Sequence, residues 1–495
     1  MSSVKLPRYE NLIDGADCPP ADGVYLDTEN PWTAQAWAQI PRSTPQDVDR
    51  AVQAAARAFR APSWAGISAT RRAALMRRLG DLVEANAPVL AEAETRDNGK
   101  TYGEMLRQMG NTAEWYRYFG GLCDKIEGRV IPVEAPGHLN YTLREPLGVI
   151  AMIIPWNSPV RLLAWKLAPA LAAGNTCVIK PSEHASTSTL QFARLVREAG
   201  FPDGVVNVVC GLGSEIGPSL VDHPAVDKVA FTGGVGSGTS VYVAAARRMR
   251  PATLELGGKS PNIVFADADL DAAANGVAAG IFASGGQSCV AGSRLLVADD
   301  IHDAFVERLV SIANRVRMGD PMDKATHIGP VANQPQFEHI MRMVEAARGE
   351  GALLACGGEA WTAPTGALFV RPTICTGVSQ DMRIAQDEVF GPVLAVLRFS
   401  TEEEAIALAN GTRFGLGAGI WTADVGRAHR MAAHVRAGSV WVNTYRMTSQ
   451  TSPFGGYDLS GVGREGGQAM VDSYLQTKSV WVNTTGAYPS AFPGI

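Results

Sequence analysis

Residues 148–183 read GVIAMIIPWNSPVRLLAWKLAPALAAGNTCVIKPSE, which is an apolar β-branched run, a helix-like segment and a second apolar run. Comparable short runs follow at residues 205–209, 229–231 and 253–256. Strands that alternate with helical segments in this way predict a parallel sheet covered by helices. We therefore expect a doubly wound α/β domain in this part of the chain.

The same alternation resumes after Pro261 and predicts a second α/β domain. Its expected strands lie at residues 262–265, 294–298 and 393–399, and its expected helices at 270–282 and 301–316. One further helical pattern begins at Pro45, and another covers about residues 70–95.

Residues 128–144 and 478–483 are typical of extended chain. Because exposed strand edges must be covered, we interpret both segments as strands that pair subunits.

Length and charge restrict the class of protein. A chain of 495 residues, 46% of them hydrophobic, is too large for one core and indicates two or three domains. The formal net charge of -5, with no basic run, argues against a nucleic-acid partner. Because no apolar stretch is long enough for a membrane span or a signal sequence, we expect a cytoplasmic protein without a membrane contact.

The seven cysteines are scattered and never form a CxxC pair, which argues against a disulfide framework or a zinc site. Six of them lie among apolar or small neighbours and are expected to be small buried residues. Cys289 differs, because the segment 284–292 (SGGQSCVAG) surrounds its thiol with small residues that leave room for a substrate. The alternative is a structural cysteine beside a flexible loop, and no nearby histidine indicates a base for it.

Several glycine clusters invite comparison with nucleotide-binding loops. The segment 257–260 fails the GxxxxGK[ST] pattern because residue 253 is threonine, and the segment 211–217 has one residue too many for GxGxxG. The segment 231–238 (FTGGVGSG) ends a strand and opens a helix, where free backbone N–H groups favour a pyrophosphate; the alternative is an ordinary turn. Lys180 and Glu183 follow a strand end, where open α/β sheets bind ligands, although a solvated surface turn has the same composition.

Taken in order, seven segments resemble the aldehyde dehydrogenase superfamily over residues 10 to 485. They are Pro155–Asn157, Lys180–Glu183, Phe231–Gly233 with Gly238, Glu255–Lys259, Gly286–Cys289, Glu388–Pro392 and Pro453–Gly456. The resemblance implies a cofactor domain made of residues 1–127 and 146–256, and a catalytic domain of residues 257–460. It also implies oligomerisation strands at 128–145 and 473–490, and hence a homodimer or homotetramer.

The resemblance further implies oxidation of an aldehyde to a carboxylic acid with NAD and water, without a metal. Cys289 would attack the carbonyl carbon, while the Asn157 side chain and the Cys289 backbone N–H hold the oxyanion. Hydride transfer then leaves a thioester, which water hydrolyses with Glu255 as the general base. Lys166 is a further catalytic candidate.

The cofactor contacts implied by the resemblance are spread over both predicted domains. They are Ile154, Pro155, Trp156, Lys180, Ser182, Glu183, Phe231, Thr232, Gly233, Gly234, Gly238, Leu256, Glu388 and Phe390. The Glu183 carboxylate is expected to accept from a ribose 2′-hydroxyl and to repel a 2′-phosphate, so we expect NAD rather than NADP. Lys180 could partly offset that repulsion.

The implied substrate tunnel is mostly apolar, which suits a medium-sized aliphatic, terpenoid or aromatic aldehyde. Its residues are Ser158, Leu162, Trp165, Ser288, Val290 and Phe454. Ser158 replaces a bulky aromatic residue that is common in the family, so the tunnel should be wider there. Arg161 lies one helical turn before Trp165 and is interpreted as a helix-surface arginine, the alternative being contact with an anionic substrate, and Arg446 is interpreted in the same way.

Three other functions compete with this hypothesis. A CoA-acylating semialdehyde dehydrogenase would pass the acyl group to CoA, but that branch generally lacks the carboxylate at Glu255. A catalytically retired structural homologue would not need Cys289, Asn157 and Glu255 together. A cysteine-dependent acyl hydrolase would leave the cofactor residues without a purpose.

Overall fold

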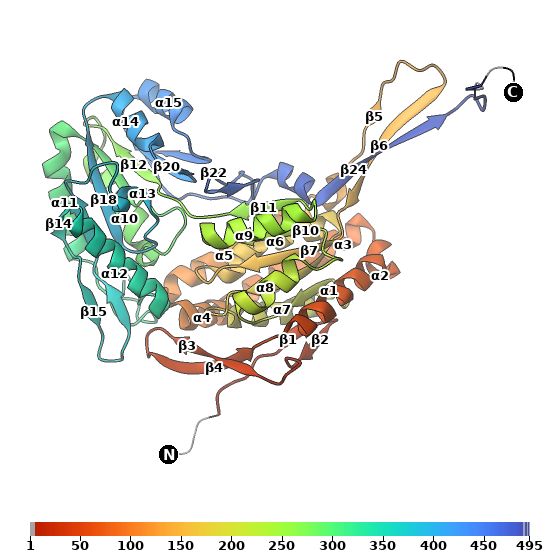
Figure 1. The fold of residues 1–495 in the computed structure, drawn as a ribbon, viewed down its shortest axis with the longest axis horizontal. Coiled ribbons are helices and arrows are strands. Elements are labelled where there is room, and N and C mark those ends of the chain that lie inside the picture. Colours follow the sequence, from red (N-terminus) through yellow and green to blue (C-terminus); the bar gives the residue numbers. More distant parts are fainter. Residues whose placement is uncertain (1–4, 489–490, 493, 495) are drawn as a thin grey trace.

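The computed structural model of the protein describes residues 5–488, 491, 492 and 494. Its described part contains two helix-covered sheets and a projecting three-stranded arm (Figure 1). The predicted α/β fold, with a doubly wound sheet, a second α/β unit and a small β region, is confirmed. Of the predicted domain ranges, residues 1–4 and 489–490 lie outside the described residues.

The first sheet has eight strands in the order β2-β1-β9-β8-β7-β10-β11-β23. The strands are β1 (Asn11–Ile13), β2 (Ala16–Cys18), β7 (Val149–Ile154), β8 (Thr176–Pro181), β9 (Val206–Val208), β10 (Lys228–Thr232), β11 (Ala252–Glu255) and β23 (Gly461–Val462). The five central strands, β7 to β11, are parallel. The edge strands β1, β2 and β23 are antiparallel to their neighbours.

Helices cover both faces of this sheet and enclose two hydrophobic cores. One face carries α1 (Pro45–Arg60), α8 (Gly213–Val221) and α9 (Val235–Arg247). The other face carries α3 (Ala69–Ala85), α4 (Ala87–Asn98), α5 (Tyr102–Gly120), α6 (Pro159–Ala173) and α7 (Thr187–Ala199). The chain runs outward through β7, β8 and β9 and then returns to β10 on the far side of β7. In doubly wound sheets, the crevice at such a reversal is where ligands bind.

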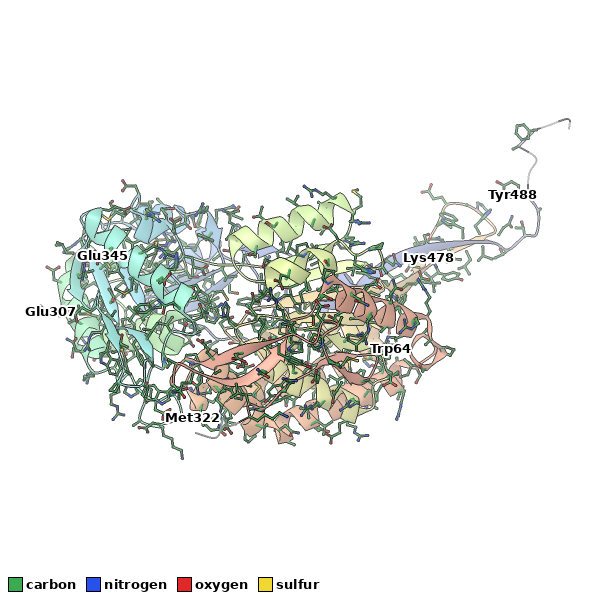
Figure 2. The ribbon with its side chains drawn as sticks, turned by 60° about the horizontal axis from the view of Figure 1, so that its bottom comes forward. Trp64, Glu307, Met322, Glu345, Lys478 and Tyr488 are labelled. Carbon is green, nitrogen blue, oxygen red and sulfur yellow. The ribbon has the colours of Figure 1, made fainter. Side chains whose placement is uncertain are left out.

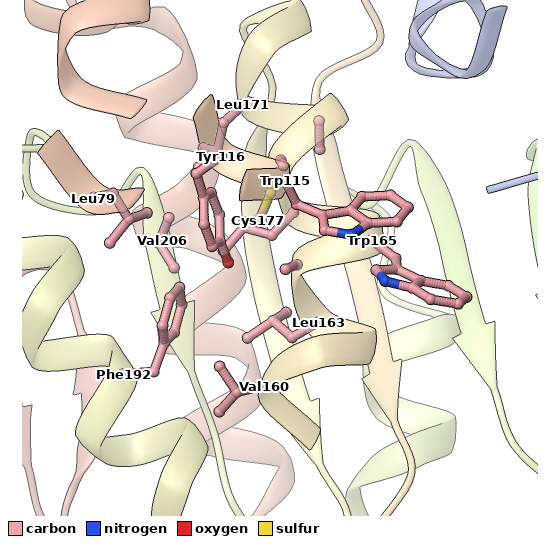
Figure 3. Packing of buried hydrophobic residues seen from close by; sticks show 14 of the residues in the cluster. Leu79, Trp115, Tyr116, Val160, Leu163, Trp165, Leu171, Cys177, Phe192 and Val206 are labelled. Atoms are coloured by element: carbon pink, nitrogen blue, oxygen red, sulfur yellow. The ribbon is translucent and has the colours of Figure 1, made fainter. Parts of the chain in front are cut away.

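The core beside β7 and β8 is built around α6, whose residues are apolar apart from Arg161 and Lys166. Every residue of this helix except Arg161 is buried, as expected for a helix without a polar face. Figure 3 shows Val160 and Leu163 of α6 in the same cluster as Tyr116 of α5 and Phe192 of α7. The rings of Tyr116 and Phe192 stack with centroids 5.8 Å apart.

The second sheet has seven strands in the order β14-β17-β18-β13-β12-β20-β21. They are β12 (Pro261–Val264), β13 (Arg294–Ala298), β14 (Leu353–Cys356), β17 (Thr373–Thr376), β18 (Val393–Phe399), β20 (Gly417–Trp421) and β21 (Ser439–Val442). One face is covered by α10 (Leu270–Phe282) and α11 (His302–Asn314), and the other by α12 (Gln334–Gly349), α14 (Glu402–Asn410) and α15 (Val425–His434). All strands are parallel except β14.

The arm consists of β5 (Val130–Ile131), β6 (His138–Pro146) and β24 (Leu475–Asn483), which pair in an antiparallel sheet. It projects away from both sheets, and Lys478 marks its position in Figure 2. Several apolar side chains of the arm are exposed, namely Val130, Leu139, Leu143, Trp481 and Val482. The predicted extended segments therefore lie side by side, although they are far apart in the sequence.

The remaining elements are short. They include the hairpins β3 (Tyr25–Asn30) with β4 (Gln35–Pro41) and β15 (Ala360–Thr362) with β16 (Leu368–Val370), the pair β19 (Phe414–Gly415) with β22 (Tyr457–Asp458), and the helices α2 (Pro62–Ala65) and α13 (Arg383–Gln386). In the part of the chain that the structure describes, no helix has the length and apolar character needed to cross a membrane.

Candidate active site

A groove of about 720 Å³ opens where the strand order of the first sheet reverses, at the carboxyl ends of β7, β8 and β10. Ten of the predicted cofactor residues line it: Ile154, Pro155, Trp156, Lys180, Ser182, Glu183, Phe231, Thr232, Gly233 and Gly234. Gly213, Ser214 and Gly217 also line it. The sequence motif at 211–217, which is weak by itself, thus reaches the same groove through the first turns of α8.

Glu183 presents a carboxylate beside this groove. Its two oxygens accept from the Lys180 ammonium at 3.3 Å and from the backbone N–H of Gly213 at 3.2 Å. Burial opposes ionisation of Glu183, but Lys180 and the backbone N–H groups outweigh it and hold its pKa below the ordinary value. The groove therefore carries a negative charge next to a buried positive one.

The N-terminus of α9, which follows β10, also lines the groove. Gly234 is the N-cap residue, and a side chain at Gly234 or Gly236 would meet open space rather than protein. Unpaired N–H groups at such a helix end favour a negatively charged group. Gly238 has another reason to be glycine, because a Cβ there would lie 2.4 Å from the Leu256 side chain. Gly238 and Leu256 thus pack against each other and do not line the groove.

A second cavity, of about 290 Å³, contains Cys289 and adjoins the groove, because both are lined by residues 155, 156 and 232–234. The other lining residues are Asn157, Leu162, Glu255, Leu256, Gly257, Gln336, His339, Glu388 and Phe390. Trp165 and Phe454 line a third cavity, of about 250 Å³. Ser158, Ser288 and Val290 line none of these three cavities.

Cys289 lies on a loop whose conformation is fixed by its neighbours. Ser284 has a φ of 59°, a left-handed value that is uncommon outside glycine, and its hydroxyl donates to the Glu104 carboxylate. The Gln287 side-chain oxygen accepts from the Ala332 N–H at 3.0 Å. The Gln287 carbonyl accepts from Asn157 Nδ2 at 3.3 Å. The Asn157 amide therefore contacts the same loop as the thiol.

The Cys289 thiol is only partly accessible, and its surroundings favour the protonated form. Burial, followed by the charges of Glu255 and Glu388, raises its pKa to about 12, while Arg446 and the Val290 N–H act in the opposite direction. Sulfur attacks a carbonyl as the thiolate, so the proton must leave this thiol during the reaction.

Glu255 ends β11 and is the candidate base for the activation of water. It is buried, and in the described part of the chain neither carboxylate oxygen has a hydrogen-bond partner. Burial, and then the nearby Glu465 carboxylate, raise its pKa well above the ordinary value, although Lys166 opposes this. A carboxyl group with a raised pKa can take up a proton near neutral pH, as a general base must.

Lys166 and Glu465 form a buried ion pair behind this cavity. Lys166 does not line the Cys289 cavity and acts on Glu255 only through its charge. Glu465 could not be singled out from the sequence, because it lies 210 positions beyond Glu255 and no local motif connects them.

Glu388 and Phe390 project from a loop that α12 holds in place. The Gln336 side chain donates to the carbonyls of Val389 and Phe390, at 3.0 and 3.1 Å. Phe390 has a φ of 53° and packs edge-on against Trp156, with ring centroids 5.3 Å apart. Glu388 accepts from the Gly258 N–H at 3.1 Å, and burial raises its pKa to about 7.

These cavities coincide with a match to a known family. The family model described as "Aldehyde dehydrogenase family" matches residues 20–480. The chain belongs to the aldehyde dehydrogenase family. It is thus an oxidoreductase, as the resemblance implied.

Two curated relatives illustrate the range of this family. The (Z)-2-((N-methylformamido)methylene)-5-hydroxybutyrolactone dehydrogenase of Acinetobacter baylyi is 48% identical, over 92% of this chain and 93% of the relative. The betaine aldehyde dehydrogenase of Cereibacter sphaeroides is 44% identical, over 96% and 97% of the two chains. The solved NAD+ complex of Bacillus cereus aldehyde dehydrogenase is 43% identical, with a TM-score of 0.94 over 96% of each chain.

One interpretation of this aldehyde dehydrogenase's sequence needs correction. Arg161 is not a solvated helix-surface arginine. Its guanidinium lies over the ring of Trp165, 5.4 Å from the centroid, and its Nη2 donates to Thr448 Oγ1 at 2.7 Å. Arg161 is the one residue of α6 that is not fully buried, so its charge is directed toward the partly open region near Thr448.

Proposed function

We propose that this protein oxidises an aldehyde to a carboxylic acid, with NAD as the hydride acceptor and water as the acyl acceptor. One observation carries the proposal: a single cavity is lined by Cys289, Asn157 and Glu255 and adjoins the groove at the reversal of the first sheet. A nucleophile, an oxyanion donor and a base are the groups that this reaction needs.

In the proposed reaction, Cys289 sulfur forms a bond to the aldehyde carbon and the thiol proton passes to water. The Asn157 amide and the Cys289 N–H donate to the resulting oxyanion, and such donors are typically worth about 3 kcal/mol each. Bound NAD supplies a hydride acceptor. Once the carbon has lost its hydride, it is a thioester on Cys289. Glu255 then takes a proton from water, the hydroxide adds to the thioester carbon, and the C–S bond breaks to release the acid and restore the thiol.

The groove residues fit NAD. The α9 N-terminus offers N–H groups to a pyrophosphate, and the open space above Gly234 and Gly236 leaves room for it. The ionised Glu183 can accept from a ribose hydroxyl, whereas a phosphate at the same place would be repelled. The neighbouring Lys180 already pairs with Glu183, which limits its ability to bind a phosphate instead.

The proposed function is tested by following NADH formation by the purified protein over a panel of aldehydes, without CoA. We expect turnover with NAD, with a kcat/KM at least about tenfold higher than with NADP, because one repulsive contact is worth about 1.4 kcal/mol or more. Turnover only after CoA is added would contradict the hydrolytic proposal and favour the acylating alternative. A higher kcat/KM with NADP would contradict the assignment of Glu183. Absence of NADH formation with every aldehyde would favour a catalytically retired homologue.

We further propose that the arm pairs subunits in a homodimer or homotetramer. Val130 and Trp481 are 73% and 58% exposed on strands whose outer edges lack partners in the described chain. Exposed strand edges and large apolar side chains of this kind are normally covered.

Light scattering should therefore give a mass that is a multiple of 52.5 kDa. Trp481→Asp should lower that mass at micromolar concentration, because a buried aromatic anchor is worth about 2 kcal/mol or more at an interface. Leu353→Asp is the matched control, since Leu353 is 67% exposed on β14, far from the arm in Figure 1. A monomeric wild type would contradict the proposal, as would an unchanged mass for Val130→Asp/Trp481→Asp.

A further inference from the structure

The third cavity has an aromatic wall and a positive edge. Trp115 and Trp165 stack with ring centroids 5.1 Å apart, and the Phe454 ring packs edge-on against Trp165 at 5.0 Å. Figure 3 shows the two indole rings side by side. Trp441 and Thr448 also line this cavity. Thr448 is the residue that accepts the hydrogen bond from Arg161.

This cavity and the one that holds Cys289 are both lined by residues of α6. Leu162 lines the Cys289 cavity and Trp165 lines the aromatic one. The two residues are three positions apart on α6 and therefore share a face of the helix. An aldehyde whose carbonyl reaches Cys289 along this face thus has its other end beside Trp165 and Arg161.

Arg446 adds a second guanidinium to the same region. It has a φ of 62°, an uncommon left-handed conformation for a non-glycine residue, and its side chain is only partly exposed. The positive charge of Arg446 lowers the pKa of the Cys289 thiol and that of Arg161. The charges of Arg161 and Cys289 also interact with each other. Both guanidinium groups are therefore within electrostatic range of the nucleophile.

The carboxylates of this region are already engaged elsewhere. Glu104 lies 4.0 Å from the buried Lys100 ammonium and accepts from Ser284. Glu94 is buried behind α6 and accepts from the Val160 N–H at 2.9 Å. Within the described chain, neither Arg161 nor Arg446 has a carboxylate within ion-pair distance. The charge of Glu104 acts on both guanidinium groups only from beyond ion-pair distance. An anion in direct contact would therefore stabilise these two partly desolvated cations.

We propose that the substrate is a short aldehyde with a carboxylate at its other end, which Arg161 and Arg446 bind at the aromatic cavity. This inference rests on the proposed function and specifies its substrate class. Guanidinium groups match the planar carboxylate and can bind it through paired N–H donors, so a carboxylate is favoured among anions. The carbon chain in between meets Leu162, Trp165 and Phe454, which are apolar.

The same geometry disfavours a cationic aldehyde. A quaternary ammonium group is commonly recognised on the face of a tryptophan ring. In this protein the Arg161 guanidinium already lies over Trp165, and it would repel a second cation there. Betaine aldehyde, the substrate named for the Cereibacter sphaeroides relative, should therefore be a poor substrate for this chain.

The test compares aldehydes of equal length and different charge. The probes are 4-oxobutanoate with longer ω-carboxy aldehydes, their methyl esters, and betaine aldehyde, each assayed for NADH formation. We expect kcat/KM for the best carboxylate to exceed that of its ester by about 30-fold or more, and betaine aldehyde to rank last. Arg161→Gln and Arg446→Gln should each lower the carboxylate-to-ester ratio about tenfold. Because the readout is a ratio, a partial loss of folded enzyme does not change it.

Arg194→Gln, which removes an exposed arginine of α7, is the matched control and should leave the ratio unchanged. Succinate and glutarate should compete with the methyl ester in the wild type and lose that effect in both active-site variants. Turnover without a preference for the carboxylate would overturn this inference alone, as would a preference for a phosphorylated aldehyde or a ratio that neither variant changes. Absence of NADH with every aldehyde would overturn the proposed function as well.

Discussion

Cys289→Ala should abolish NADH formation, with kcat at least about 10⁴-fold below that of the wild type, as for other removed covalent nucleophiles. An aldehyde carbon releases hydride readily only after a nucleophile has made it tetrahedral and negatively charged at oxygen. Alanine offers no such atom, and the other groups of the cavity cannot replace the sulfur. NAD binding, measured by calorimetry, should stay within about threefold of the wild type, because Cys289 does not line the cofactor groove.

Cys356→Ala is the matched control for this experiment. Cys356 is also a partly buried free cysteine, but it lies on β14, and its thiol contacts the Pro372 carbonyl rather than a cavity. Its replacement should leave turnover within about twofold of the wild type. Residual turnover of Cys289→Ala near the wild-type rate would contradict its assignment as the nucleophile. Loss of NAD binding would show that the substitution disturbs the fold instead.

Much of the fold could be predicted because the buried strands carry strong patterns. The runs at 149–154, 294–298 and 393–399 become β7, β13 and β18 with the same bounds. Parallel strands covered on both faces are apolar over their whole length, and this makes them visible in a sequence. The strands β2 to β4 are partly exposed, and β1 is buried but only three residues long, so these strands lack such a pattern.

One predicted helix proved to be two. The helical pattern over about residues 70–95 is interrupted at Asn86, where α3 ends and α4 begins. Pro88 is tolerated only because it falls in the first turn of the new helix. The apolar periodicity continues across the break because both helices pack on the same core, so periodicity alone could not locate it.

The site residues also differ in how far the sequence reveals them: those in continuous motifs can be predicted, and those contributed by distant segments cannot. Residues in continuous motifs, such as Lys180 with Glu183, could be proposed from sequence because a strand end and a turn place them. Gln336, His339 and Glu465 could not, since only the packing of α12 and of the C-terminal segment brings them to the cavities. The sequence around Arg161 did contain a signal, because a helix with apolar residues on nearly every side offers no polar face for an arginine.

Glu255→Gln should separate the two halves of the reaction. Glutamine keeps the shape of the side chain but cannot take a proton from water, so hydride transfer proceeds and the acyl group stays on Cys289. We expect one NADH per active site in the first turnover, followed by steady-state turnover about 10² to 10⁴-fold below the wild type. Intact mass spectrometry should show the protein plus one acyl group. Hydroxylamine, which needs no general base, should release that group and restore turnover.

The pH dependence of the same step follows from the surroundings of Glu255. Burial and Glu465 hold its pKa well above the ordinary value, so Glu255 stays protonated, and unable to act as a base, up to a higher pH than an ordinary carboxyl group. Hydrolysis of the acyl-enzyme by the wild type should therefore rise by up to about tenfold per pH unit until the pH reaches that raised pKa. In Glu255→Gln this dependence should disappear, because the titrating group is absent. Unchanged steady-state turnover in the variant, or the same pH profile as the wild type, would show that another group activates the water.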